Sequence, residues 1–292
     1  MPDPRLLSDN FLSFVERFDA LLRDPAAGID TPTAVSLAPA AESTGAPVCV
    51  LVSPHPDDEA ISGAIAWRLR HEAGWRVVNL AVTLGSRLDR RSQRWAEAQA
   101  CCDALGFELR AASGQPGQGL EGISPKDAAA NSPQWQQAVL ALKTQLAACQ
   151  PRLVVCPHAL DGHNTHIATS LLAQQAVAAW APAQLDLLYS EYWNTQLEPR
   201  LAVGLSPQAV AALMRALVHH QGEIRRHPYH RLLPSWFADG ARRAAERVNA
   251  PGSGALDFSF AALYGWRALR SGQWQQAAPM VWAPHQPWAQ LF

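Results

Sequence analysis

The chain has 292 residues, enough to bury a substantial core, and its 24 basic and 25 acidic residues leave a formal net charge of −1. A balance this close to neutral gives no electrostatic reason to expect a nucleic-acid partner. No apolar run reaches the ~18 residues that a transmembrane segment needs, and acidic residues interrupt the N-terminus where a signal peptide would be apolar. We therefore expect a cytoplasmic globular protein without a transmembrane segment.

The predicted elements alternate between helices and strands. An apolar-patterned helix near residues 7–22 precedes a connector rich in proline and alanine. The patterns that follow predict, in chain order, strand 47–53, helix 59–73, strand 76–83, helix 90–105, strand 107–111, helix 134–149, strand 152–157, helix 163–180, strand 185–190 and helix 206–221. Such alternation is typical of a parallel sheet with right-handed crossovers. The sequence therefore predicts an α/β protein with a three-layer Rossmann-like fold and a mostly parallel sheet.

The turn after the first predicted strand carries an unusual set of polar residues. It contains His55, Asp57 and Asp58, directly before a predicted helix. A proline and acidic side chains also suit an ordinary helix start, where they complement the helix dipole. A neutral imidazole before the proline adds nothing to such a start. This turn alone therefore leaves a functional site and a structural helix cap as open alternatives.

A second polar turn favours the functional interpretation. Strand 152–157 is followed by Asp161, His163 and His166, and the carboxyl ends of parallel strands meet at one edge of a sheet. His55 and Asp58 are three residues apart and can face the same ion, with His166 as a third ligand.

Two histidines and one carboxylate, with a position left for water, form the ligand set of a catalytic zinc site. Iron, cobalt and nickel in their divalent states would also accept these ligands, so Zn²⁺ is the default metal. Asp57 would remove a proton from the bound water. His163, as a cation, would stabilise the oxyanion and protonate a leaving amine.

Five segments together resemble the LmbE-like or PIG-L family of zinc-dependent de-N-acetylases. They are Pro-His-Pro-Asp-Asp-Glu at 54–59, Thr-Leu-Gly at 83–85, Arg-Trp-Ala-Glu at 94–97, Leu-Gly at 105–106 and His-x-x-His at 163–166. The resemblance covers roughly residues 46–200. Family members remove acetyl groups from N-acetylglucosamine units in glycolipids, thiol glycosides and antibiotics. The resemblance implies the same zinc ligands, general base and acid partner that the spacing suggests.

The chain departs from the family at the second turn. The family has His-Pro-Asp-His there, whereas this chain has Asn164 and Thr165 between the histidines. Because the family's aspartate orients the first histidine, we expect Asp161 to orient His163 instead. The expected function is deacetylation of an N-acetylated amino sugar, as a small molecule or glycoconjugate. The alternatives are an amidase acting on a non-sugar amide or a larger acyl group, and a glycan-binding relative without catalysis.

Further residues are candidates for substrate binding. Arg94 ends a basic run that begins at Arg87, and it can reach the site if the run is more than a solvated helix start. Glu191 and Tyr192 follow the last predicted strand, where a carboxylate and a ring could bind a sugar. The glycines between residues 114 and 122 predict a loop over the crevice. A nucleotide site is disfavoured because no Gly-x-Gly-x-x-Gly follows the first strand.

The predicted organisation has three parts. Residues 1–45 form the N-terminal helix and connector, residues 46–224 the catalytic domain, and residues 225–292 a C-terminal extension that packs on the same domain. The five cysteines show no paired framework and are expected to be reduced core residues. A homo-oligomer is among the alternatives that the sequence leaves open.

Overall fold

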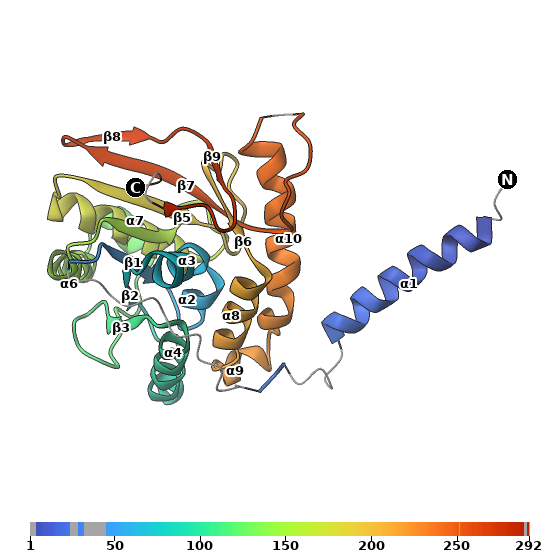
Figure 1. Ribbon diagram of the computed structural model, residues 1–292. Helices are drawn as coiled ribbons and strands as arrows, with labels where there is room; N and C mark the ends of the chain where they lie inside the picture. Colours follow the sequence, from blue (N-terminus) through green and yellow to red (C-terminus); the bar gives the residue numbers. More distant parts are fainter. Residues whose placement is uncertain (1–3, 24–28, 32–44, 251, 289–290, 292) are drawn as a thin grey trace.

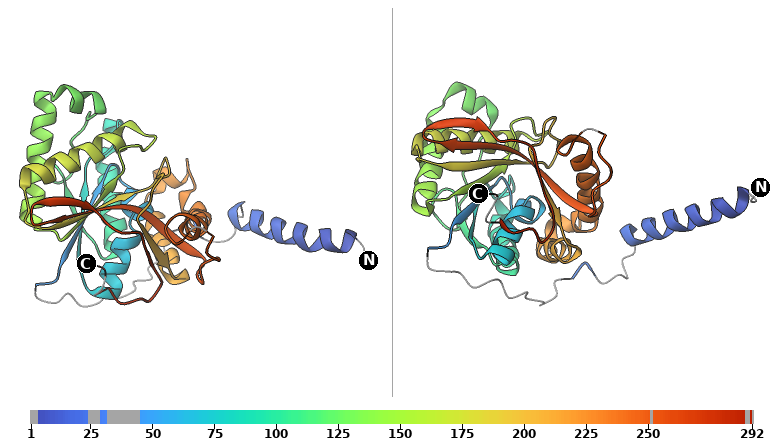
Figure 2. Two further views of the ribbon diagram at one scale, coloured as in Figure 1. Left: turned by 90° about the horizontal axis from the view of Figure 1, so that it is seen from above. Right: turned by 45° about the horizontal axis from the view of Figure 1, so that its top comes forward.

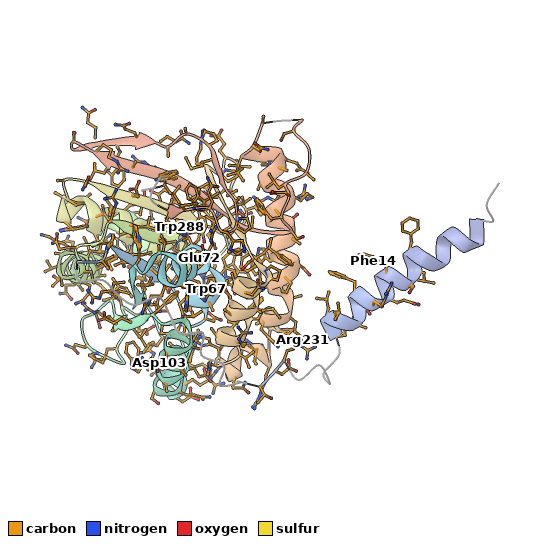
Figure 3. The ribbon with its side chains drawn as sticks, viewed as in Figure 1. Phe14, Trp67, Glu72, Asp103, Arg231 and Trp288 are labelled. Atoms are coloured by element: carbon orange, nitrogen blue, oxygen red, sulfur yellow. The ribbon has the colours of Figure 1, made fainter. Side chains whose placement is uncertain are left out.

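The fold is given by a computed structural model, which describes residues 4–23, 29–31, 45–250, 252–288 and 291 (Figure 1). Most of the predicted connector lies outside these residues. The predicted N-terminal helix is present as α1 (Pro4–Arg23), which projects away from the rest of the molecule and contacts α10 (Tyr229–Arg247) (Figures 1 and 2). Most of the apolar side chains described between residues 11 and 23 are exposed, among them Phe14 at 66% (Figure 3).

A nine-stranded sheet forms the centre of the protein. Its strands run in the order β3-β2-β1-β4-β5-β7-β6-β9, with β8 paired to β7. Their bounds are β1 (Val48–Ser53), β2 (Arg76–Ala81), β3 (Glu108–Ala111), β4 (Leu153–Pro157), β5 (Leu185–Ser190), β6 (Leu201–Leu205), β7 (Phe260–Arg270), β8 (Gln273–Gln276) and β9 (Met280–Trp282). Strands β3, β2, β1, β4 and β5 are mutually parallel, whereas β7 is antiparallel to its three partners.

Helices cover both faces of the sheet. They are α2 (Asp58–Ile61), α3 (Ala64–Ala73), α4 (Arg91–Leu105), α5 (Pro125–Ala130), α6 (Pro133–Cys149), α7 (Asn164–Trp180), α8 (Pro207–Leu217), α9 (Gln221–Ile224) and α10 (Tyr229–Arg247), with a short 3-10 turn at Leu88–Arg90. Side chains alternate along β1, so that Leu51 packs with α3, α4 and α8 while Val50 packs with α6 and α7. This arrangement confirms the predicted three-layer α/β fold.

The helix predicted over 59–73 is interrupted, which corrects one boundary. It divides into α2 and α3 at Ser62 and Gly63. The hydroxyl of Tyr264 donates to the Ser62 carbonyl and accepts from the Ile65 amide, each at 3.2 Å. A side chain from β7 thus replaces the helical hydrogen bond that the Ile65 amide would otherwise make. The break orients α2 independently of α3.

The C-terminal part of the chain contributes strands to the central sheet. β7 lies between β5 and β6, and Trp266 on it donates to Asp186 of β5 at 2.9 Å. Arg270 makes a bidentate contact with the same carboxylate, both bonds being 2.8 Å. Close to the C-terminus, Trp288 donates to Glu72 of α3 at 3.2 Å (Figure 3). None of the helices within the described residues has the length and apolarity needed to span a bilayer.

We expect Gly240→Ala to destabilise the protein because α10 lies unusually close to β7 at this position. A Cβ on Gly240 would be 2.0 Å from the Ala261 carbonyl oxygen, so the helix would have to move away from the strand. Urea denaturation should show a loss of about 2 kcal/mol. The control is Gly254→Ala, where a Cβ meets nothing within 4 Å. Equal stability of the two variants would contradict the close packing.

Candidate active site

The candidate site lies where the parallel strands β1 and β4 end. The turn after β1 is fixed to the segment after β2, because the amide and hydroxyl of Thr83 both donate to the Pro54 carbonyl, at 3.0 and 2.8 Å. The turn after β4 leads into α7, which begins at Asn164. As the topology predicts, the two turns converge at one edge of the sheet.

Three predicted metal ligands meet around one carboxylate oxygen. Asp58 Oδ2 lies 3.5 Å from His55 Nδ1 and 3.5 Å from His166 Nε2. Two donors that share a tetrahedral zinc ion through bonds of ~2.1 Å would be roughly 3.4 Å apart. The separations therefore suit a common ion better than direct hydrogen bonds.

Polar atoms that are buried without a hydrogen-bond partner are a second feature expected of a metal site. Asp58 Oδ1 and His166 Nε2 are buried and have no hydrogen-bond partner among the described residues. Burial alone would raise the pKa of Asp58, but His166 and His55 lower it below its usual value. Asp58 is therefore a carboxylate, as a metal ligand must be. His163 also brings a ring nitrogen to within 4.8 Å of those of His55 and His166.

Asp161 faces a different histidine from the one the sequence suggests. Its Oδ2 lies 3.5 Å from Nδ1 of His166, the nitrogen opposite the Asp58 side of that ring. Toward His163 it makes only a backbone contact, accepting from the amide at 2.9 Å. The expectation that Asp161 orients the His163 ring is therefore corrected. A carboxylate behind a ligating histidine is the usual outer contact of a metal site.

His163 serves as the N-cap of α7. Its Nδ1 accepts from the Thr165 amide at 3.3 Å, which places the ring proton of the neutral form on Nε2. Burial lowers the pKa of His163, and the nearby His55 and His166 lower it further. The ring stacks on Trp193 with centroids 5.8 Å apart. These contacts favour a neutral His163 over the cation that the sequence suggested.

Asp57 occupies a strained backbone position beside the ligands. Its φ of 113° lies in a region that non-glycine residues rarely adopt. The amide of Asp57 donates to Glu59 Oε2 at 2.9 Å, and its carbonyl accepts from the Ala60 and Ile61 amides. Burial raises the pKa of Asp57 well above its usual value, and the charge of Asp58 adds to the increase.

Glu59 has a buried partner that the sequence did not reveal. Its Oε1 lies 2.7 Å from Nε2 of His220, and both residues are 0% exposed. Cys101 lies beside them, so the three could be taken for a second metal site. However, 2.7 Å is a hydrogen-bond distance and is too short for two ligands of one zinc ion. The Glu59–His220 pair instead supports the backbone of Asp57. The sequence contained no indication of this pair, because a histidine at position 220 is also typical of an ordinary helix C-terminus.

A cavity of about 760 Å³ opens next to these residues. His55, Asp57, His163, Arg94 and Tyr192 line it. The predicted glycine loop contributes to its wall through Gly122. Arg87, Arg90 and Arg91 of the basic run also line it, so this run is more than a solvated helix start.

Two aromatic contacts place Tyr192 at the cavity wall. Its ring lies 5.1 Å from that of His166 and 5.4 Å from that of Trp236. Glu191 does not line this cavity. Its carboxylate instead forms a two-bond ion pair with Arg243, at 2.6 and 2.7 Å. Of the predicted site residues, the structure therefore brings all but Glu191 to the ligand cluster or its cavity.

The fold and the site define an α/β protein with histidines and carboxylates at the carboxyl edge of its sheet. Residues 50–177 match the PIG-L family, described as GlcNAc-PI de-N-acetylase. These residues form a PIG-L (LmbE-like) family domain, which confirms the resemblance. Among curated protein sequences, none matches this chain.

Solved structures share the fold at low sequence identity. The conserved protein TT1542 from Thermus thermophilus is 18% identical with a TM-score of 0.58, covering 82% of this chain and 98% of its own. The N,N'-diacetylchitobiose deacetylase from Pyrococcus horikoshii is 16% identical with a TM-score of 0.54, covering 87% and 92%. The 4-carboxy-2-hydroxymuconate hydratase GalB from Pseudomonas putida is 17% identical with a TM-score of 0.52, covering 75% and 95%. Because the two enzymes catalyse different reactions, these similarities establish the fold and not the chemistry.

We expect His220→Ala to cost about 3 kcal/mol of stability, because it leaves the buried carboxylate of Glu59 without its partner. Urea denaturation should show this loss. The matched control is His219→Ala, since the neighbouring His219 is partly exposed and lies outside the pair. A His220→Ala variant as stable as the His219→Ala variant would contradict the role of the pair.

Proposed function

We propose that this protein is a zinc-dependent deacetylase that removes the acetyl group from an N-acetylated amino sugar. The observation that carries the proposal is the position of Asp58 Oδ2, 3.5 Å from one ring nitrogen each of His55 and His166. The cluster borders a cavity large enough for a sugar, and family membership favours amide hydrolysis at this edge of the sheet.

The residues that would hold the metal are His55, Asp58 and His166. The unpartnered buried atoms of Asp58 and His166, and the spacing of all three side chains, support this assignment. A zinc ion bound there would lower the pKa of its water to ~7 and polarise an acyl carbonyl. Asp161 would orient His166 from behind.

Asp57 is the proposed general base. Its carboxyl group lines the cavity beside Asp58, and burial together with the Asp58 charge makes it more basic than an ordinary aspartate. It would take a proton from the attacking water and then return it to the leaving amine.

His163 would stabilise the developing oxyanion. With Nδ1 engaged by the Thr165 amide, its Nε2 proton is the one left to donate to the carbonyl oxygen. Tyr192 and Trp193, whose rings lie 5.0 Å apart, offer aromatic surface for the sugar ring. Burial raises the pKa of Tyr192, so its hydroxyl keeps its proton and can donate a hydrogen bond.

The first test measures acetate release from N-acetylglucosamine compounds together with metal content. We expect the metal-loaded protein to release acetate and a chelator to abolish release. Asp57→Asn should lower kcat by about 10²- to 10⁴-fold while bound metal is retained. His166→Ala should lose the metal as well. Acetate release that persists in the presence of chelator or in Asp57→Asn would contradict the mechanism, whereas release of other acyl groups alone would favour the amidase alternative.

The second test addresses the support of the metal by Asp161. Because this carboxylate faces His166 at 3.5 Å, Asp161→Asn should weaken zinc affinity by about 10- to 100-fold. A competition titration with a zinc chelator measures this change. Asp103→Asn on α4 is the control, since Asp103 is exposed and its side chain accepts a hydrogen bond from Gln99 of the same helix. Unchanged affinity in Asp161→Asn would remove Asp161 from the site.

A further inference from the structure

One wall of the cavity carries a concentration of positive charge. The arginines that line it are Arg87, Arg90, Arg91, Arg94 and Arg226. They come from the 3-10 turn and the residue before it, from α4 and from the segment after α9, so separate parts of the chain supply them. The wall begins next to the turn after β1, because Arg94 donates a hydrogen bond to the carbonyl of Pro56 in that turn at 2.9 Å.

Two of these arginines have carboxylate partners of their own. Arg87 pairs with Asp89 at 2.6 Å, and Arg91 lies 3.4 Å from a carboxylate oxygen of Glu121. Both pairs are locally neutral and contribute little net charge to the cavity.

The other three arginines share a single carboxylate. Glu223 lies 3.2 Å from Arg90 and 3.9 Å from Arg94, and it also pairs with Arg226. Burial alone would raise the pKa of Glu223, but the three arginines hold it below its usual value, so Glu223 is ionised. Within this group three arginines face one carboxylate, and Asp57, whose pKa Arg94 also lowers, is a second carboxyl group that lines the cavity beside them.

The backbone beside this group is adapted to hold the guanidinium groups. A Cβ on Gly222 would be 1.9 Å from Arg90 Nη2, and a Cβ on Gly85 would be 2.3 Å from Arg94 Nη1. Any other residue at these positions would displace an arginine. Arg90 Nη2 and Arg94 Nε also have no hydrogen-bond acceptor among the described residues, so Glu223 does not saturate the group. Arg226 is 63% exposed in its side chain and can contact a ligand in the cavity.

We propose that this wall binds a phosphate monoester carried by the amino-sugar substrate, an inference that rests on the proposed deacetylase function. A phosphate monoester has a charge near −2 at neutral pH and three acceptor oxygens, so it can contact two guanidinium groups at once, whereas a carboxylate has half that charge. Arginine forks bind phosphate oxygens in pairs, and a partly buried site strengthens such contacts. Arg226 and the exposed part of Arg90 make the contacts, and Glu223 holds the two side chains in position.

The test compares four substrates on the zinc-loaded enzyme: N-acetylglucosamine, its 1-phosphate, its 6-phosphate and N-acetylmuramic acid, which carries a carboxylate. We expect kcat/KM to be at least about tenfold higher for one of the phosphates than for the other two sugars. Arg226→Gln should reduce that preference by about tenfold, because it removes a charge-assisted contact. Arg225→Gln is the matched control, since Arg225 is the exposed neighbour that does not line the cavity.

A binding measurement separates this inference from the proposed function. Calorimetry with glucose 1-phosphate and glucose 6-phosphate, which have no acetyl group, should show binding that weakens in Arg226→Gln and not in Arg225→Gln. If such binding is found but no sugar releases acetate, the phosphate site stands and the deacetylase proposal fails. If acetate is released equally from all four substrates, or preferentially from the carboxylate, the phosphate inference is overturned and the deacetylase proposal stands. Phosphate affinity that is equal in the two variants would also overturn the inference.

Discussion

Three consecutive buried carboxyl groups impose the main electrostatic constraint on this protein. Asp57, Asp58 and Glu59 are 7%, 2% and 0% exposed, and adjacent buried carboxylates repel one another while losing their hydration. Each therefore requires its own compensation from elsewhere in the chain. Asp58 faces two histidines, Glu59 pairs with His220, and Arg94 lowers the pKa of Asp57 against the effect of burial.

These compensating residues come from separate elements, and this explains much of the architecture around the site. His166 is presented by α7, His220 precedes α9, and Arg94 belongs to α4. The turn after β1 is thus surrounded by helices from both halves of the chain. The interruption between α2 and α3, maintained by Tyr264 of β7, lets α2 remain short and present the acidic residues as a group.

The same arrangement places two chemically different groups of residues at the cavity. The histidines and Asp58 form a cluster whose spacing suits a metal ion, while the arginines around Glu223 form a wall with excess positive charge. His55 and His163 are the members of the first group that line the cavity. Residues of both groups affect the pKa of Asp57, since Arg94 lowers it while Asp58 and Glu223 raise it. On the proposed function, a substrate that bridges the two groups would have its acetyl group and an anionic group recognised by different parts of the chain.

The sequence by itself determined the order of the strands and main helices from β1 to β5, the two polar turns and their convergence, because hydrophobic periodicity and the direction of parallel strands are local or topological properties. It did not predict strands β6 to β9 or helix α10. It also singled out His55, Asp58 and His166, which the structure places together. Only the tertiary structure decided which partner each charged group received. The pairing of His220 with Glu59 spans 161 positions, and the contact of Glu191 with Arg243 spans 52. Such pairings depend on how helices pack across the sheet, and no local pattern encodes that packing.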